Sequence, residues 1–145
     1  MAPMNSLHAA AIMLTSKAVE ETFGADYIVR EQLPFNAGID SEPEPDIAVV
    51  TGNIRDYVEH HPTTALLIVE ISDATLQFDR TKKAELYARS GIVEYWIVNL
   101  KARQLEVRRE PQNGKYAKTE TLTEKQNVAT LAMPKKKIKV ADLLP

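Results

Sequence analysis

Several features that define common protein classes are missing from this 145-residue sequence. It has no cysteine, which excludes disulfide bridges, thiolate zinc sites and cysteine nucleophiles. It has no glycine-rich phosphate-binding loop and no nucleophile elbow. No apolar run approaches the length that spans a bilayer, and the first residues do not combine a basic segment with an apolar one. We therefore expect a cytoplasmic protein with no signal peptide and no membrane contact.

The composition is typical of a globular protein, with 44% hydrophobic and 26% charged residues. We expect a single domain over residues 1–145, long enough to bury a core without covalent cross-links. The net charge of −2 argues against a protein that coats nucleic acid by bulk electrostatics. Residues 1–60 have 10 acidic and 3 basic side chains, whereas residues 79–118 have 5 acidic and 10 basic ones. This asymmetry would suit a divalent cation beside phosphates, although an ordinary solvated surface is the more common reason for it.

Apolar periodicity predicts a mixed central β-sheet flanked by helices, which is an α/β (α+β) architecture. The expected order is αβββαβ, followed by an appended β-hairpin. An amphipathic helix should run from about Ser6, its N-cap, to Phe23, with Gly24 as its stop. Beyond it we expect strands over residues 27–35, 46–50, 65–72 and 93–98, a helix over 79–90 capped by Asp79, and more exposed strands over 105–109 and 135–140.

Glu70 is the one charged residue in the most apolar predicted strand, residues 65–72. A buried carboxylate is costly unless it is paired or binds a metal ion. Alternation places Glu70 on the same face as Ser72, and Asp46 stands at the start of another β-branched run. Two carboxylates at neighbouring strand ends would make an oxygen-rich site suited to Mg²⁺. Pairing of Glu70 with an arginine at the sheet edge explains its position equally well.

The helix after this strand supplies a positively charged side chain. At about 100° per residue, Ala84, Tyr87 and Ala88 share the face that should cover the sheet, and Lys83 lies on the flank of that face. Lys82 points towards solvent. Lys83 is therefore the lysine that could reach the acidic pair, although a lysine whose stem covers apolar surface is the more common case.

The three histidines do not predict a metal site. His60 and His61 precede Pro62 in a loop, and His8 lies at the start of the first helix. Nothing in the sequence indicates that these residues converge, so no histidine-ligated metal is expected.

An ordered set of short segments resembles a known family. The segments are Ser41–Asp46, Val69–Asp73, Thr75–Leu76, Asp79–Arg80, Lys83, Tyr87–Ala88 and Glu94–Val98. They resemble the bacterial restriction-endonuclease-like proteins of the PD-(D/E)XK nuclease superfamily, and the similarity extends over nearly the whole chain. The resemblance implies a restriction-endonuclease-like core, with Asp46 as the motif aspartate and Glu70 as the second acid. Ser72 stands where the superfamily has its motif lysine, and Lys83 is implied as the replacement.

The resemblance further implies a Mg²⁺-dependent DNA endonuclease, with Mn²⁺ as an alternative cation. Asp46, Glu70 and the backbone carbonyl of Ile71 would hold the ion. Lys83 would orient or deprotonate the attacking water, or neutralise charge on the scissile phosphate. Because the chain has little surface for reading DNA sequence, we expect a homodimer or a separate specificity partner. The alternative is a catalytically inactive module that keeps the fold and binds nucleic acid or protein. Supporting roles are considered for Glu21, Ser72 and Asp79.

Overall fold

The central strands are buried on both faces, and this burial organises the protein around a six-stranded sheet. The computed structural model describes residues 4–38 and 41–145, so Met1 to Pro3 of the N-terminal segment considered above lie outside it. The sheet order is β1-β2-β3-β4-β5-β6, with β3 and β4 parallel and every other neighbouring pair antiparallel. The expected mixed sheet is therefore confirmed. The strands are β1 (Tyr27–Glu31), β2 (Ile47–Thr51), β3 (Leu67–Ser72), β4 (Glu94–Asn99), β5 (Gln104–Gln112) and β6 (Lys115–Thr123).

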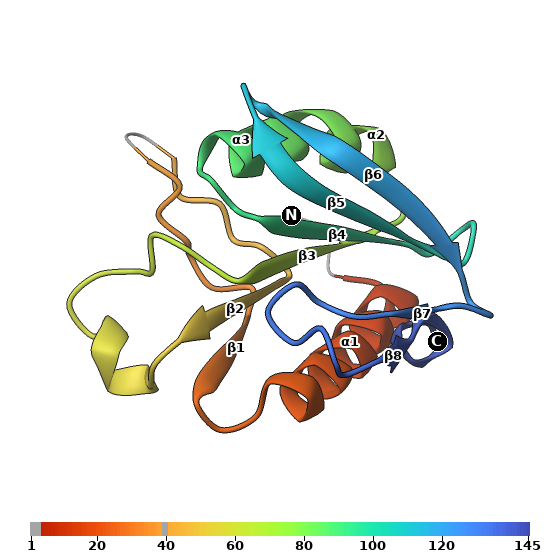
Figure 1. Cartoon of the computed structure of the whole chain (residues 1–145), viewed down its shortest axis with the longest axis horizontal. Coiled ribbons are helices and arrows are strands. Elements are labelled where there is room, and N and C mark those ends of the chain that lie inside the picture. Colours follow the sequence, from red (N-terminus) through yellow and green to blue (C-terminus); the bar gives the residue numbers. More distant parts are fainter. Residues whose placement is uncertain (1–3, 39–40) are drawn as a thin grey trace.

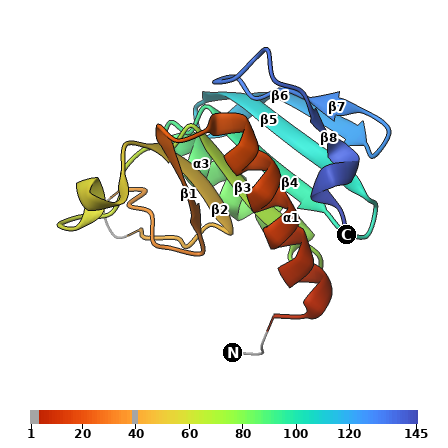
Figure 2. The same cartoon turned by 90° about the horizontal axis from the view of Figure 1, so that it is seen from below.

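Helices cover both faces of the sheet (Figure 1; Figure 2). Helix α1 (Ser6–Phe23) packs on one face together with the C-terminal turn η3 (Val140–Leu143). The short helices α2 (Leu76–Phe78) and α3 (Ala84–Arg89), joined by the π-helical segment η2 (Asp79–Lys83), cover the other face. Each face has its own buried apolar cluster, because side chains along a strand alternate between the two faces.

Two helix starts differ from the sequence prediction. Helix α1 is capped by Asn5 rather than Ser6, because the Asn5 side chain accepts a hydrogen bond from the backbone N–H of His8 at 2.8 Å. The second helical region begins at Leu76, so Asp79 does not cap it and lies inside it, buried. A capping residue type favours a helix start at its position but does not determine it.

A hairpin is appended as expected, but it is formed by β5 and by β6, a strand that the sequence pattern did not indicate. The strand expected over 135–140 is reduced to two residues and belongs to a separate two-stranded sheet. Strands β7 (Asn127–Val128) and β8 (Ile138–Lys139) pair antiparallel, and η3 then packs beside α1 (Figure 2). Within the described residues, no helix combines the length and the apolar character that crossing a membrane requires.

Candidate active site

The pairing of β2 with β3 brings Asp46 and Glu70 together. Asp46 directly precedes β2, and Glu70 lies in β3. The backbone N–H of Asp46 donates to Glu70 Oε1 at 2.9 Å, and the backbone N–H of Ile71 donates to Asp46 Oδ2 at 2.8 Å. Each carboxylate is thus held by the backbone of the segment that carries the other acid. The predicted placement of the two acids at neighbouring strands is confirmed.

Lys83 reaches this acidic pair from η2. Its Nζ lies 2.9 Å from Glu70 Oε2, and the Tyr87 hydroxyl donates a hydrogen bond to the same oxygen at 2.9 Å. The Lys83 side chain is only 21% exposed, whereas Lys82 is exposed to solvent. The placement of Lys83 predicted from helical geometry therefore agrees with the structure. The partner of Glu70 is this lysine rather than an arginine at the sheet edge.

A π-helical turn, which the sequence pattern did not indicate, carries Lys83. Two further contacts attach this turn to the sheet. The carbonyl of Asp79 accepts a hydrogen bond from the Tyr95 hydroxyl at 2.9 Å, and Arg80 Nε donates to Glu106 Oε2 at 2.9 Å. Such turns are rare and occur frequently at functional sites. The turn therefore holds Lys83 on a fixed element, above the end of β3.

Burial changes the protonation equilibrium of Glu70. Desolvation raises the pKa of its carboxyl to about 7, while the Lys83 charge lowers this pKa and the Asp46 charge raises it. Burial and the adjacent Glu70 also raise the pKa of the Tyr87 hydroxyl, which therefore stays protonated and donates its hydrogen bond. A divalent cation beside Glu70 would favour its ionised form.

His8, in the first turn of α1, also approaches the acidic pair, and this was not expected from the sequence. Its Nε2 lies 3.5 Å from Asp46 Oδ2, and the two side chains are 22% and 15% exposed. This nitrogen is buried and has no hydrogen-bond partner among the residues that the structure describes. The available signal was a histidine at the start of a predicted helix, but only the packing of α1 against the sheet brings it to Asp46.

The three residues considered for supporting roles lie in different places. Ser72 is fully buried at the end of β3, and its hydroxyl has no hydrogen-bond partner within the described part of the chain. Asp79 is also buried; its Oδ2 accepts a hydrogen bond from the Thr75 hydroxyl at 2.9 Å, and burial raises the pKa of its carboxyl. Glu21 is exposed, about 20 Å along α1 from His8. Glu21 is therefore too far away to act at the acidic pair.

Another buried acid, Glu94, belongs to the opposite face of the sheet. It pairs with Arg109 Nη2 at 2.7 Å and accepts hydrogen bonds from Trp96 Nε1 at 2.9 Å and from the Leu131 backbone N–H at 2.8 Å. Trp96 is part of the apolar cluster under α1, whereas Tyr87, the partner of Glu70, is part of the cluster under α3. Glu94 therefore ties a C-terminal loop to β4 and does not face the candidate site.

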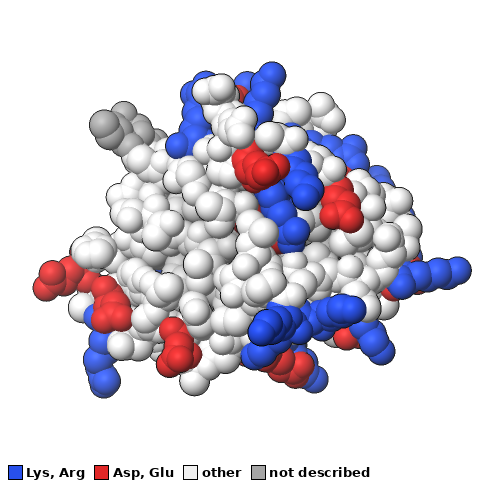
Figure 3. Space-filling model, viewed as in Figure 1, with Lys and Arg blue, Asp and Glu red and all other residues white. Residues whose placement is uncertain are grey.

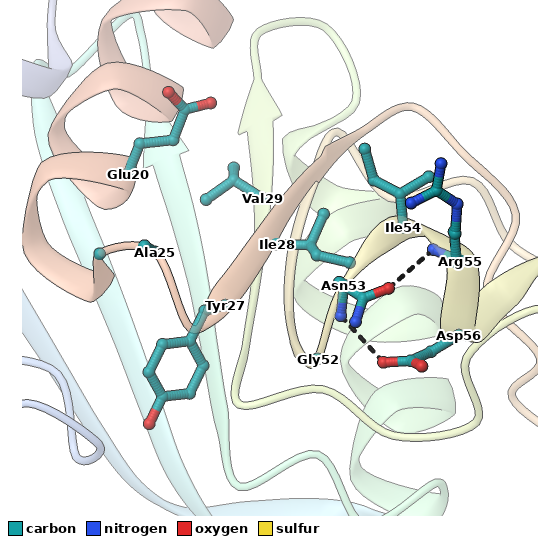
Figure 4. Close-up of a pocket in the computed structure, with 11 residues that line it drawn as sticks. Glu20, Ala25, Tyr27, Ile28, Val29, Gly52, Asn53, Ile54, Arg55 and Asp56 are labelled. Carbon is teal, nitrogen blue, oxygen red and sulfur yellow. Dashed lines mark hydrogen bonds between the residues drawn. The ribbon is translucent and has the colours of Figure 1, made fainter.

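The open pocket in Figure 4 also lies away from the acidic pair. It has a volume of about 940 Å³ and is formed by the end of α1, by β1, and by the turn η1 (Ile54–Tyr57) with the preceding loop. Its lining includes Glu20, Tyr27 and Arg55 but not Asp46, Glu70 or Lys83. The acidic pair is therefore separate from this pocket. On the face shown in Figure 3, Lys and Arg side chains are interspersed with Asp and Glu side chains.

The donor atoms at the acidic pair fit a hard divalent cation. Asp46 and Glu70 contribute carboxylate oxygens, and the Ile71 carbonyl lies on the same edge of β3 as the N–H that binds Asp46. The buried Nε2 of His8 is a further donor. Within residues 4–38 and 41–145, no three His, Asp or Glu side chains are already arranged as a cation site. Glu70 is directed at Lys83 instead, so cation binding requires its carboxylate to turn.

Comparison with known proteins agrees with this architecture. Residues 1–141 match the Uma2 family model, whose description is "Putative restriction endonuclease". The crystal structure of "a putative nuclease belonging to DUF820" from Anabaena variabilis ATCC 29413 has a similar fold, with a TM-score of 0.73. It is 17% identical in sequence, and the match covers 97% of this chain and 82% of that chain. No curated protein sequence matches this chain. Because the family model matches nearly the full length, the chain belongs to the Uma2 family.

Proposed function

We propose that this protein is a DNA endonuclease of the PD-(D/E)XK type that uses Mg²⁺ or Mn²⁺ to hydrolyse phosphodiester bonds. The observation that carries the proposal is the convergence of Asp46, Glu70 and Lys83 from three separate segments. A buried carboxylate beside a second carboxylate costs folding free energy, and a bound divalent cation would offset that cost. Membership of a family described as restriction endonucleases supports the same class of chemistry.

Each residue of the site would have a separate role in hydrolysis. Asp46, Glu70 and the Ile71 carbonyl would hold the cation, which polarises the phosphate and makes a bound water more acidic. Lys83 would orient the attacking water or neutralise the charge that develops on the phosphate oxygens. Tyr87 would keep Glu70 oriented through its hydrogen bond. Since the chain offers little surface for reading a DNA sequence, the proposal includes a second copy or a separate specificity partner.

A catalytically inactive binding module is the second candidate, and one observation favours it. Both carboxylate oxygens of Glu70 already have protein partners. Oε1 accepts a hydrogen bond from the Asp46 N–H, while Oε2 contacts Tyr87 and Lys83. A buried acid that is satisfied in this way can serve as one half of a structural ion pair without any cation. The two candidates differ in the expected response to divalent cations.

Cleavage of supercoiled, linear and branched DNA, with Mg²⁺, Mn²⁺ or EDTA, tests the proposal. We expect wild-type protein to cleave DNA only with a divalent cation. Lys83→Ala should lower the rate by about 100-fold or more, because it removes the positive charge beside the reacting water and phosphate. Lys82→Ala is the matched control, since Lys82 lies in the same segment but is exposed to solvent. Its rate should stay within about twofold of wild type.

Two results would contradict the nuclease proposal. One is wild-type protein that binds DNA but does not cut it with either cation. The other is an equal loss of rate in Lys83→Ala and Lys82→Ala, which would indicate a general electrostatic effect rather than a role of Lys83 at the site. The first result would favour the inactive binding module.

A further inference from the structure

We propose that His8 is a third side-chain ligand of the cation at Asp46 and Glu70, and that its nitrogen gives the site a preference for Mn²⁺ over Mg²⁺. This inference rests on the proposed metal site and specifies its ligands and selectivity. It adds a residue from α1 to a site otherwise built from the β2–β3 pair. Two observations on one atom carry it: the distance from His8 Nε2 to Asp46, and the burial of this nitrogen without a hydrogen-bond partner among the described residues.

The distance between the two side chains suits a shared cation. Two ligand atoms that bind one ion at adjacent octahedral positions, each at about 2.1 Å, are separated by about 3 Å. His8 Nε2 and Asp46 Oδ2 are 3.5 Å apart, so a small rotation of either side chain would let both contact one ion. The same distance is long for a direct N–H···O hydrogen bond. The spacing therefore allows the two side chains to share one ion.

The burial of His8 Nε2 needs an explanation. The atom is buried, and no hydrogen-bond partner for it is found in residues 4–38 and 41–145. Burial of a polar nitrogen without a partner costs free energy, so such atoms usually have a partner of some kind. The oxygen that faces this nitrogen, Asp46 Oδ2, already accepts the Ile71 N–H. A cation bound to Nε2 and to Asp46 would satisfy the nitrogen.

The backbone of His8 is held firmly enough to present a ligand. His8 lies in the first turn of an 18-residue helix, and its N–H is bound by the Asn5 cap at 2.8 Å. Further along α1, Ala11 and Ile12 are buried in the apolar cluster on the sheet. The imidazole is thus carried by a packed helix, and ligands on rigid elements are positioned more precisely than ligands on loops.

An imidazole nitrogen affects the choice of cation. Mg²⁺ prefers oxygen ligands and keeps several of its waters, whereas nitrogen ligands favour first-row transition ions. Mn²⁺ accepts the same carboxylate and carbonyl oxygens as Mg²⁺ and gains more from an added nitrogen. The donor set of Asp46, Glu70, the Ile71 carbonyl and His8 should therefore bind Mn²⁺ more tightly than Mg²⁺.

Pulsed electron paramagnetic resonance of Mn²⁺ bound to tag-free protein tests the inference directly. We expect a modulation from a coordinated ¹⁴N nucleus in wild type, lost in His8→Ala and kept in His60→Ala. His60 is the matched control because it is an exposed imidazole in a loop. By calorimetry, His8→Ala should weaken Mn²⁺ binding by about tenfold or more and Mg²⁺ binding by less than about threefold.

The outcomes separate this inference from the proposed function. Bound Mn²⁺ without nitrogen coupling in wild type overturns the role of His8, and DNA cleavage measured on the same samples shows whether the nuclease proposal still stands. Equal weakening of Mn²⁺ and Mg²⁺ in His8→Ala also overturns it, since His8 would then only orient Asp46. Nitrogen coupling in a protein that does not cut DNA supports the ligand role and contradicts the nuclease. The wild-type spectrum decides the question even where the variant folds poorly.

Discussion

Glu70 and Glu106 lie in register across the sheet, opposite Ile97 of the strand between them. Each forms an ion pair with a basic side chain of η2. Lys83 binds Glu70, and Arg80, three residues earlier, binds Glu106. Both acids are buried. Segment η2 is therefore tied to β3 and to β5 at once, and the orientation of Lys83 depends partly on a contact outside the candidate site.

Glu106→Gln should loosen η2 and lower the free energy of unfolding. Burial acts to raise the pKa of Glu106, but hydrogen bonds from Arg80 and Arg108 outweigh it, so the pKa is lowered and the acid stays ionised. Loss of this charge leaves two guanidinium groups without their partner, at a cost of about 2 kcal/mol because Arg80 remains partly solvated. Urea denaturation measures the change. The control Glu120→Gln, at an exposed position of β6, should leave the free energy of unfolding within about 0.5 kcal/mol of wild type. A similar loss of stability in both variants would contradict the role of the Arg80 contact.

Glu70 should make the protein less stable as the pH rises from about 4.5 to 7. Its pKa is raised from 4.5 to about 7, mainly by burial, so the folded protein keeps a proton that the unfolded chain releases. The resulting stabilisation is complete below pH 4.5 and is lost as the pH rises through 7, by about 3 kcal/mol at most. Glu70→Gln should flatten this slope in urea denaturation between pH 4 and 8. The exposed control Glu59→Gln should keep it, and an unchanged slope in Glu70→Gln would assign the effect to other groups.

Asp46→Asn should abolish the stabilisation of the folded protein by Mg²⁺ or Mn²⁺ while leaving the fold intact. The amide oxygen of asparagine can still accept the Ile71 N–H, and the Asp46 backbone bond to Glu70 does not depend on the side chain. The variant loses the anionic oxygen that a hard cation prefers. It also loses repulsion between two carboxylates, so without cations it should melt at or slightly above the wild-type temperature.

Thermal melts of both proteins with and without each cation measure these effects. Wild type that does not respond to cations, together with a large loss of stability in Asp46→Asn, would favour the inactive module. In that case Asp46 would be a structural partner whose removal leaves a buried charge unpaired.

Glu94→Gln should destabilise the protein without changing its affinity for divalent cations. Glu94 is fully buried and pairs with Arg109, which is 19% exposed, so loss of the charge should cost about 3 kcal/mol. The acid faces the α1 side of the sheet, away from Glu70. Urea denaturation and calorimetric titration with Mn²⁺ on the same variant measure both effects. Weaker cation binding by the folded variant would show that the two faces of the sheet are coupled.

The order of the main helices and strands as far as β4 and the position of Lys83 could be predicted because both depend on local periodicity. The apolar run around Glu70 indicated a doubly buried strand, and the alternation of its side chains placed Glu70 and Ser72 on one face. Helical spacing separated Lys83 from Lys82 without knowledge of any other segment. The helix starts were less well predicted. The first helix is capped by Asn5 rather than by Ser6, and the second helical region begins at Leu76 rather than after a cap at Asp79.

The amino-acid sequence by itself therefore determined which side chains share a face within each element. It did not determine which elements meet. The approach of His8 to Asp46 joins residues 38 positions apart, and the Arg80–Glu106 contact joins residues 26 apart. Both follow from the packing of α1 and η2 on opposite faces of one sheet, since burial of apolar faces selects these contacts and local propensity does not encode them. The π-helical turn that carries Lys83 also depends on the tertiary structure. Its geometry is stabilised by contacts with three strands rather than by its own residues.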